Sequence, residues 1–211
     1  SLSLSLILIL IFILIFYLFI YLFILFYFIL FYFFCVCTNL LLQICSQLEE
    51  LDLTHTAADD ACVTAVAENC LKLKQLELRC SNVGALGLAA VASFLKGLQY
   101  LGLARCSQVD EDALEGLLSS PTPLRHLVVD SCGVTDAFLL QLSSCAPSLR
   151  VLDVSYARKT SVQALVKLVK LCSELRLLEV WGVGLTAADI DRLLHVRPEL
   201  FLIGVPVDRQ P

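Results

Sequence analysis

The first 48 residues contain no charged side chain, and the whole chain of 211 residues contains no methionine. Glycine (9) and proline (6) are few, which excludes collagen-like and Pro/Gly-rich disordered chains. The 15 Lys and Arg are outnumbered by 20 Asp and Glu and are scattered along the sequence. Proteins that bind nucleic acid need clustered basic side chains to neutralise phosphates. We therefore expect no nucleic-acid partner.

An apolar leader opens the chain, because residues 1–34 contain only Ser, Leu, Ile, Phe and Tyr. At ~1.5 Å per residue, a helix of this length would cross a hydrocarbon core of ~30 Å. The segment lacks the flanking Lys and Arg that orient a membrane helix, and it lacks the basic start of a secretory signal. Its Ser-Leu repeat over 1–6 is what an in-frame TC repeat encodes.

Two interpretations of this leader, residues 1–38, stay open. The one we favour is a gene-model artefact, in which a pyrimidine tract before a splice acceptor has been translated and the natural exon begins near Asn39 to Gln43. The other is a transmembrane anchor, in which case any membrane contact runs through residues 1–34. Residues 39–211 form a second region, with the charge content of an ordinary soluble domain.

One pattern, Leu-x-x-Leu-x-Leu with Val or Ile at some positions, recurs seven times at steps of 25 or 26 residues. Such a constant period is the mark of a repeat architecture. The matches begin at Leu48, Leu73, Leu98, Leu124, Leu149, Leu175 and Leu200.

Each repeat has the pattern of a strand followed by a helix. The Leu-x-Leu end alternates as a half-buried strand, and a helical spacing follows about fifteen residues later, as in Val63, Val66 and Ala67. Thr56 and Thr186, each three residues before an Asp, have the spacing of a capping box. A unit this small cannot bury its own apolar face. We therefore predict an α/β solenoid, with a curved parallel sheet and helices on the convex side.

These repeats resemble the cysteine-containing leucine-rich repeats of F-box/LRR substrate receptors in SCF-type ubiquitin ligases. The resemblance covers about residues 45–205. The cysteine that follows the strand in that family matches Cys106 and Cys132, with Cys80 one residue early. The cysteine that closes the preceding helix matches Cys45, Cys70 and Cys172.

The resemblance implies the substrate-recognition part of an F-box/LRR subunit, acting in ubiquitin-dependent protein degradation. An SCF adaptor is then a partner only if an F-box lies upstream, because residues 1–47 contain nothing like one. Two alternatives stay open, namely a stand-alone LRR adaptor without a ligase link and a membrane-anchored LRR protein.

Cysteine usage indicates the compartment. Eight of the ten cysteines lie between Cys45 and Cys172, mostly at repeat positions that face the core, where thiols behave as small hydrophobes. Reduced thiols indicate the cytoplasm or the nucleus. Cys35, Cys37 and Cys45 lack metal-ligand spacing, and no catalytic or nucleotide-binding motif is present. We expect no metal, no cofactor and no enzyme.

Function is expected on the concave face, where outward strand side chains of successive repeats line up about 5 Å apart. We predict that a protein substrate with a basic or mixed segment binds a carboxylate ladder there, anchored by aromatic side chains and above all by Trp181. The alternative is that these side chains are ordinary solvated surface, with Trp181 packed on the last repeat. The predicted partner-binding residues are Glu50, Asp52, Glu77, Arg79, Tyr100, His126, Asp130, Asp153, Tyr156, Glu179 and Trp181.

Overall fold

The computed structural model describes residues 45–119 and 121–205. The apolar leader, with both interpretations of it, lies outside the described residues. Within these ranges, strands and helices alternate after a short 3-10 helix, η1 (Cys45–Gln47). The strands are β1 (Glu50–Asp52), β2 (Gln75–Glu77), β3 (Tyr100–Gly102), β4 (His126–Val128), β5 (Val151–Asp153), β6 (Leu177–Glu179) and β7 (Phe201–Ile203). The helices are α2 (Asp60–Asn69), α3 (Ala85–Phe94), α4 (Glu111–Leu117), α5 (Asp136–Cys145), α6 (Val162–Leu171) and α7 (Ala187–Val196).

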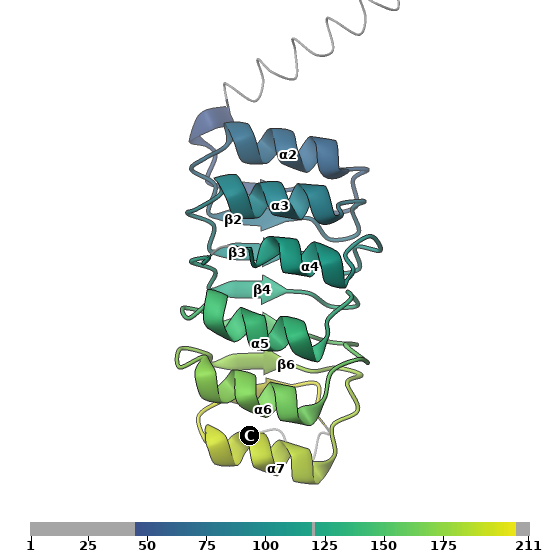
Figure 1. Cartoon of the computed structure of the whole chain (residues 1–211), viewed down its shortest axis with the longest axis vertical. Coiled ribbons are helices and arrows are strands. Elements are labelled where there is room, and N and C mark those ends of the chain that lie inside the picture. The colour runs from purple at the N-terminus through teal and green to yellow at the C-terminus, as the bar shows by residue number, and fades with distance from the viewer. Residues whose placement is uncertain (1–44, 120, 206–211) are drawn as a thin grey trace, which may run out of the picture. The chain divides into compact units, whose positions relative to one another are not determined.

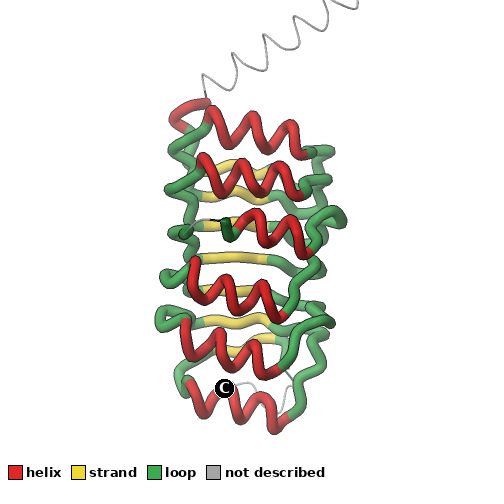
Figure 2. The backbone as a smooth tube through the Cα atoms, viewed as in Figure 1, coloured by secondary structure: helices red, strands yellow, loops and turns green. Residues whose placement is uncertain are grey.

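The seven described strands form one parallel sheet in sequence order, β1 to β7. Each strand pairs with the next at equivalent repeat positions, so that Leu51 faces Leu76 and Leu76 faces Leu101. All the helices cover the same side of the sheet (Figures 1 and 2). The predicted leucine-rich-repeat solenoid is confirmed.

The repeat leucines form the core between the sheet and the helices. Leu76, Leu101 and Leu127 are fully buried, and so are the helix residues Val63 and Ala67. Each buried leucine contributes about 1.5–3 kcal/mol relative to an exposed one. The repeats therefore depend on their neighbours for the burial that one unit lacks.

The seventh repeat differs from the predicted pattern by one residue. In the sheet, Leu178 of β6 pairs with Leu202, and Glu179 pairs with Ile203. The predicted inward residue, Ile203, therefore faces outward, while Leu202 enters the core and is 2% exposed. The sequence pattern allowed both registers because Leu200, Leu202 and Val205 are all apolar. All three are buried in the structure.

Helix capping follows the prediction at one end of the array and departs from it at the other. Thr186 and Asp189 form the capping box of α7. Thr56 caps no helix, because its hydroxyl donates to the Leu53 carbonyl while Asp59 accepts from Cys62 N and caps α2. The described loop between β1 and α2 is thus longer than the Thr-x-x-Asp spacing predicts.

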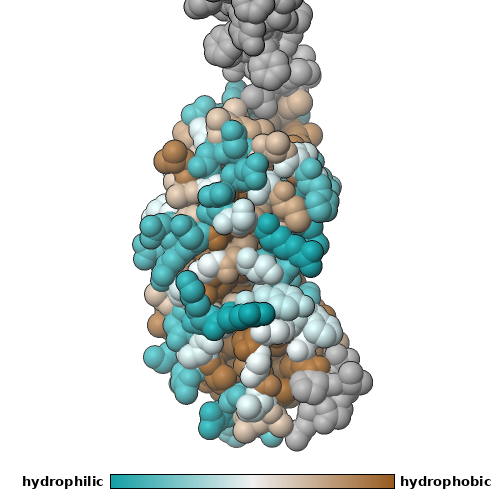
Figure 3. All heavy atoms as spheres, turned by 90° about the vertical axis from the view of Figure 1, so that its right-hand side faces the viewer, coloured by the Kyte–Doolittle hydropathy of each residue, from teal (hydrophilic) through white to brown (hydrophobic). Residues whose placement is uncertain are grey.

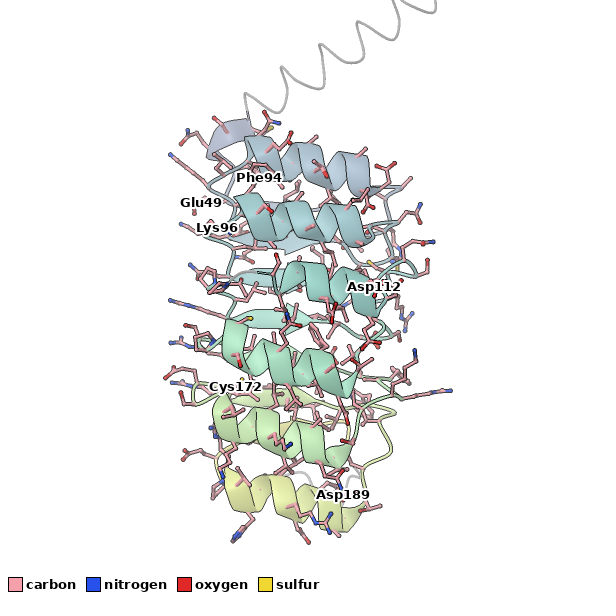
Figure 4. The ribbon with its side chains drawn as sticks, viewed as in Figure 1. Glu49, Phe94, Lys96, Asp112, Cys172 and Asp189 are labelled. Atoms are coloured by element: carbon pink, nitrogen blue, oxygen red, sulfur yellow. The ribbon has the colours of Figure 1, made fainter. Side chains whose placement is uncertain are left out.

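Acidic residues at helix starts also join one repeat to the next. Asp60, in the first turn of α2, accepts hydrogen bonds from Gly84 N (2.6 Å) and Gly87 N (2.9 Å) at the start of α3. Asp136 of α5 accepts from Ser161 N and Ser161 Oγ, both at 2.6 Å. Free N–H groups at a helix start favour an anionic acceptor. Asp112 and Asp189, at other helix starts, lie at the same edge of the array, opposite Cys172 (Figure 4).

Three of the eight described cysteines, Cys70, Cys106 and Cys172, are core residues as predicted, whereas Cys62 is exposed and the other four are partly exposed. All eight described cysteines are free thiols. Cys106 Sγ donates to the Leu78 carbonyl of the preceding repeat at 2.9 Å, and burial raises the pKa of Cys132 to about 12. Cys80 is indeed one residue early, since it has a positive φ of 57° and Ser81 occupies the buried position instead.

Helix spacing is uneven along the array. The packing is close from α2 to α4 and loosest between α4 and α5. At the third helical position α3 and α4 have the small residues Gly87 and Ala113, whereas α5 has Phe138, the largest fully buried side chain. Phe138 is thus the bulkiest residue at this position among these three helices.

No helix within 45–119 and 121–205 combines the length and the apolar character needed to cross a membrane.

Candidate protein-binding face

The sheet side opposite the helices, the concave face, carries three rows of side chains. Rows one and two are fixed by the strand register, and row three follows two residues further along each chain segment. Row one is Glu50, Gln75, Tyr100, His126, Val151, Leu177 and Phe201. Row two is Asp52, Glu77, Gly102, Val128, Asp153, Glu179 and Ile203. Row three is Thr54, Arg79, Ala104, Asp130, Ser155 and Trp181.

Polar side chains bond to one another over β1 to β4. Gln75 Nε2 donates to Glu50 Oε1 at 2.7 Å. Tyr100 Oη donates to Glu77 Oε2 at 2.5 Å, and the Tyr100 ring meets the His126 ring edge-on with centroids 4.7 Å apart. These groups therefore satisfy much of their own hydrogen-bonding capacity.

The predicted carboxylate ladder is not continuous. In row two, Asp52 and Glu77 are separated from Asp153 and Glu179 by Gly102 and Val128, both buried. A Cβ on Gly102 would collide with the Glu77 carboxylate, so the glycine leaves room for the bond to Tyr100. The face thus carries two separate acidic pairs.

The two pairs differ in electrostatic environment. Asp52 accepts from Thr54 N at 2.8 Å, and this hydrogen bonding lowers the pKa of Asp52. Burial, followed by the negative charge of Asp153, raises the pKa of Glu179. Among the described residues the Glu179 carboxylate has no ion-pair partner. Hydrogen bonds thus favour the charged form of Asp52, whereas burial and a neighbouring negative charge disfavour the charged form of Glu179.

Two aromatic residues near the ends of β5 and β6 pack on glycines. A Cβ on Gly182 would collide with the Tyr156 ring, and one on Gly204 would collide with the backbone and ring of Trp181. Tyr156 N donates to the Trp181 carbonyl at 2.6 Å, and Trp181 N donates to Ser155 Oγ at 3.2 Å. Trp181 packs on the last described repeat. Even so, Trp181 and Tyr156 are each 48% exposed. We call Tyr156 and Trp181 the aromatic shelf.

The other predicted site residues fall at the same ends of the strands. Arg79 is exposed in row three, where its N–H donates to Glu77 Oε1 at 3.1 Å. Asp130 accepts from Ser131 Oγ and lies 3.8 Å from Arg105 Nε. Tyr156 lies beyond row three at a positive φ of 60°. The structure thus gathers all eleven predicted residues on the concave face or at its edge, but over both halves of the array.

Four apolar residues of this face were missing from the predicted site. Val151, Leu177 and Phe201 follow one another in row one, and Ile203 lies in row two. Phe201 is 47% exposed. Figure 3 views one edge of the array, and on that edge apolar surface is visible among the last repeats. The alternation of the strands placed Val151 and Leu177 outward, so the signal was present. The predicted site consists of polar and aromatic side chains and contains none of these four residues.

No group of three His, Cys, Asp or Glu side chains that could hold a metal ion occurs in the described part of the chain. The described face is a surface of apolar, aromatic and acidic side chains.

Comparisons with known proteins agree with the repeat architecture. A family model described as "Leucine Rich repeat" matches residues 69–92. F-box protein FBW2 of Arabidopsis thaliana is 25% identical over 172 residues, which cover 78% of this chain and 54% of that protein. The chain therefore spans about half the length of this curated relative. Together with the seven-stranded parallel sheet, these similarities show a leucine-rich-repeat fold whose repeats are similar to those of F-box/LRR proteins.

Proposed function

We propose that this protein is the substrate-recognition part of an F-box/LRR subunit of an SCF ubiquitin ligase and that it acts in ubiquitin-dependent protein degradation. The observation that carries the proposal is the similarity to an F-box protein over 78% of this chain. A protein substrate binds the concave face, and an SCF adaptor binds an F-box encoded upstream.

The surface chemistry supports binding rather than catalysis. Aromatic side chains dominate the binding energy of protein interfaces, and the aromatic shelf leaves two of them half exposed on a rigid backbone. The free thiols of the described repeats suit the cytoplasm or the nucleus, where cysteines stay reduced.

The first experiment is to sequence the mature transcript from its 5′ end through the codons for Leu48 to Leu53. An F-box ahead of the repeats, with residues 1–34 absent, is the expected result. A start codon ahead of an intact apolar leader would replace the ligase proposal with a membrane-anchored LRR protein. A transcript with neither the leader nor an F-box would indicate a stand-alone adaptor.

The second experiment measures the complex itself. The full-length protein is purified from its own cells after proteasome inhibition, and cullin and ubiquitinated partners are quantified. We expect both to co-purify, with the partner but not cullin reduced by Trp181→Ala. A protein that carries no cullin under these conditions would contradict the ligase role.

A further inference from the structure

The concave surface over β5 to β7 combines an apolar row with an acidic pair. Val151, Leu177 and Phe201 lie side by side on adjacent strands, spaced by about 4.8 Å. Asp153 and Glu179 lie two residues further along β5 and β6 and are themselves paired neighbours. We call these five residues with Trp181 the C-terminal patch.

The acidic pair has unused charge. One carboxylate oxygen of Asp153 accepts a hydrogen bond from Ser155 N at 2.8 Å. Glu179 has no ion-pair partner among the described residues. Two neighbouring carboxylates repel one another, which is part of the reason why the pKa of Glu179 is raised. A cation placed between them would relieve this repulsion.

The aromatic shelf limits the choice of cation. Trp181 follows Glu179 by two residues and packs one side on Gly204, while about half of its surface stays exposed. A planar guanidinium can pair with carboxylates and stack on an indole at the same time, whereas an ammonium is a compact, strongly hydrated charge. Arginine fits this arrangement better than lysine.

The spacing of the rows limits the shape of the partner. Rows one and two are two residues apart on the same strand, or about 6.6 Å. An extended peptide places side chains of alternate residues on one side at the same separation. We propose that the C-terminal patch binds an extended protein segment in which an arginine lies two residues from a bulky apolar side chain. The arginine lies between Asp153 and Glu179. The apolar side chain packs on Val151, Leu177 and Phe201.

This inference rests on the proposed protein-binding function and names the chemistry of the bound segment. Over β1 to β4 the equivalent positions are unsuitable. Glu77 is bonded to Tyr100 and Glu50 to Gln75, and row one has no large aliphatic side chain there. The two halves therefore differ in the chemistry that they offer to a partner.

The chain has a single tryptophan, Trp181, so its fluorescence reports directly on the patch. The full-length protein is titrated with a short synthetic peptide in which leucine and arginine alternate at every second position, separated by serine. We expect a change in Trp181 emission that saturates, and binding that weakens as salt rises. Peptides with glutamate for arginine, or serine for leucine, should bind at least ~10-fold more weakly, and lysine for arginine should weaken binding more modestly.

Variants locate the site. Asp153→Asn with Glu179→Gln should weaken the leucine–arginine peptide at least ~10-fold, and so should Trp181→Ala as measured with a labelled peptide. The control pair Asp112→Asn with Glu115→Gln removes the same charge from two exposed acids of α4 and should change affinity by less than roughly twofold, because α4 lies on the other side of the sheet. Circular dichroism of each variant verifies the fold.

Three outcomes would overturn the inference. The first is equal affinity for the glutamate and arginine peptides, and the second is equal loss in the control pair. The third is tight binding that appears only after residues 206–211 are removed, which would make that segment of the chain the occupant. If the peptide does not bind but Trp181→Ala still abolishes binding of a protein substrate, only the proposed arginine-and-apolar chemistry is rejected. If the peptide binds but the transcript encodes no F-box, only the ligase role is rejected.

Discussion

The concave face carries different chemistry over its two halves, although the backbone register is the same throughout. Over β1 to β4, Glu50 bonds to Gln75 and Glu77 bonds to Tyr100, so polar groups are largely satisfied by each other. Over β5 to β7, Val151, Leu177 and Phe201 take the equivalent positions of row one. Side chains that bond to one another stabilise the array, whereas half-exposed apolar side chains remain available for a partner.

The acidic residues of row two show the same contrast. Hydrogen bonds from Thr54 favour the charged form of Asp52 and lower its pKa, while burial and Asp153 disfavour the charged form of Glu179 and raise its pKa. A group held in an unfavourable environment without structural benefit is a candidate for function. Glu179, not Asp52, meets that description.

The largest expected effect lies at the boundary between the halves. Phe138→Ala should lower the free energy of unfolding by about 3–5 kcal/mol, because it empties the space that a fully buried ring of α5 fills. Hydrogen exchange should show the greatest loss of protection in the repeats on either side, since repeat arrays couple mainly through neighbours. Leu140→Ala on the same helix, at a site 36% exposed, serves as the control and should cost far less. Equal loss of protection along all repeats would contradict this.

Two glycines allow the halves to be compared with a single added methyl group. Gly204→Ala should cost about 2–3 kcal/mol, because Gly204 has a φ of 86° and a Cβ there would meet Trp181 backbone atoms. Gly102→Ala should cost about 1 kcal/mol, since the Glu77 side chain can move at the expense of its bond to Tyr100. Chemical denaturation measures both.

Gly184→Ala separates strain from collision in that experiment. Gly184 has a φ of 85°, and a Cβ there would meet no atom within 4 Å. It should therefore show the backbone strain alone, about 1 kcal/mol. If Gly204→Ala costs no more than Gly184→Ala, the packing of Trp181 on Gly204 does not stabilise the last repeat.

The smallest expected effects have opposite signs. The folded-state pKa of Glu179 is raised, so its stabilising contribution is present below the unfolded pKa of about 4.3 and is lost as pH rises. Glu179→Gln should therefore increase stability slightly at pH 7. The pKa of Asp52 is lowered, so its contribution is present above about 3.9 and lost as pH falls, and Asp52→Asn should decrease stability slightly at pH 7.

Thermal denaturation of both variants and the parent between pH 3 and pH 7 tests these signs, and each difference should shrink at the acid end. Loss of stability in Glu179→Gln at pH 7 would show that its carboxylate supports the fold rather than a partner.

Much of the fold could be predicted because its signals are local and repeated. Leu76, Leu101 and Leu127 recur at a near-constant period, and their burial follows from strand alternation. The helix start at Thr186 was predicted from its capping box. The start of α2 was not, because Thr56 and Asp59 have the same spacing and only the path of the loop decides which one caps the helix.

The candidate site was less predictable. The eleven predicted residues lie along the concave face or at its edge, and Gly102 and Val128 divide the carboxylates of row two into two pairs. The apolar row was overlooked, since exposed Val and Leu resemble core residues in sequence. Whether these residues bind a partner stays a prediction.

The sequence alone determined the repeat period, the alternation of strand and helix, the recurring positions of the cysteines and the direction of each side chain in the regular repeats, because these depend on neighbours along the chain. Tertiary structure decided which bonds cross between repeats. Stacking of the repeats brings Asp60 and Asp136 into hydrogen bonds with the start of the next helix. It also places the Glu77 carboxylate over Gly102 and Trp181 against Gly204. It also fixed the register of β7 and the wide spacing at Phe138. Contacts between residues some 25 positions apart depend on how one repeat stacks on the next, and packing of large and small side chains sets that stacking.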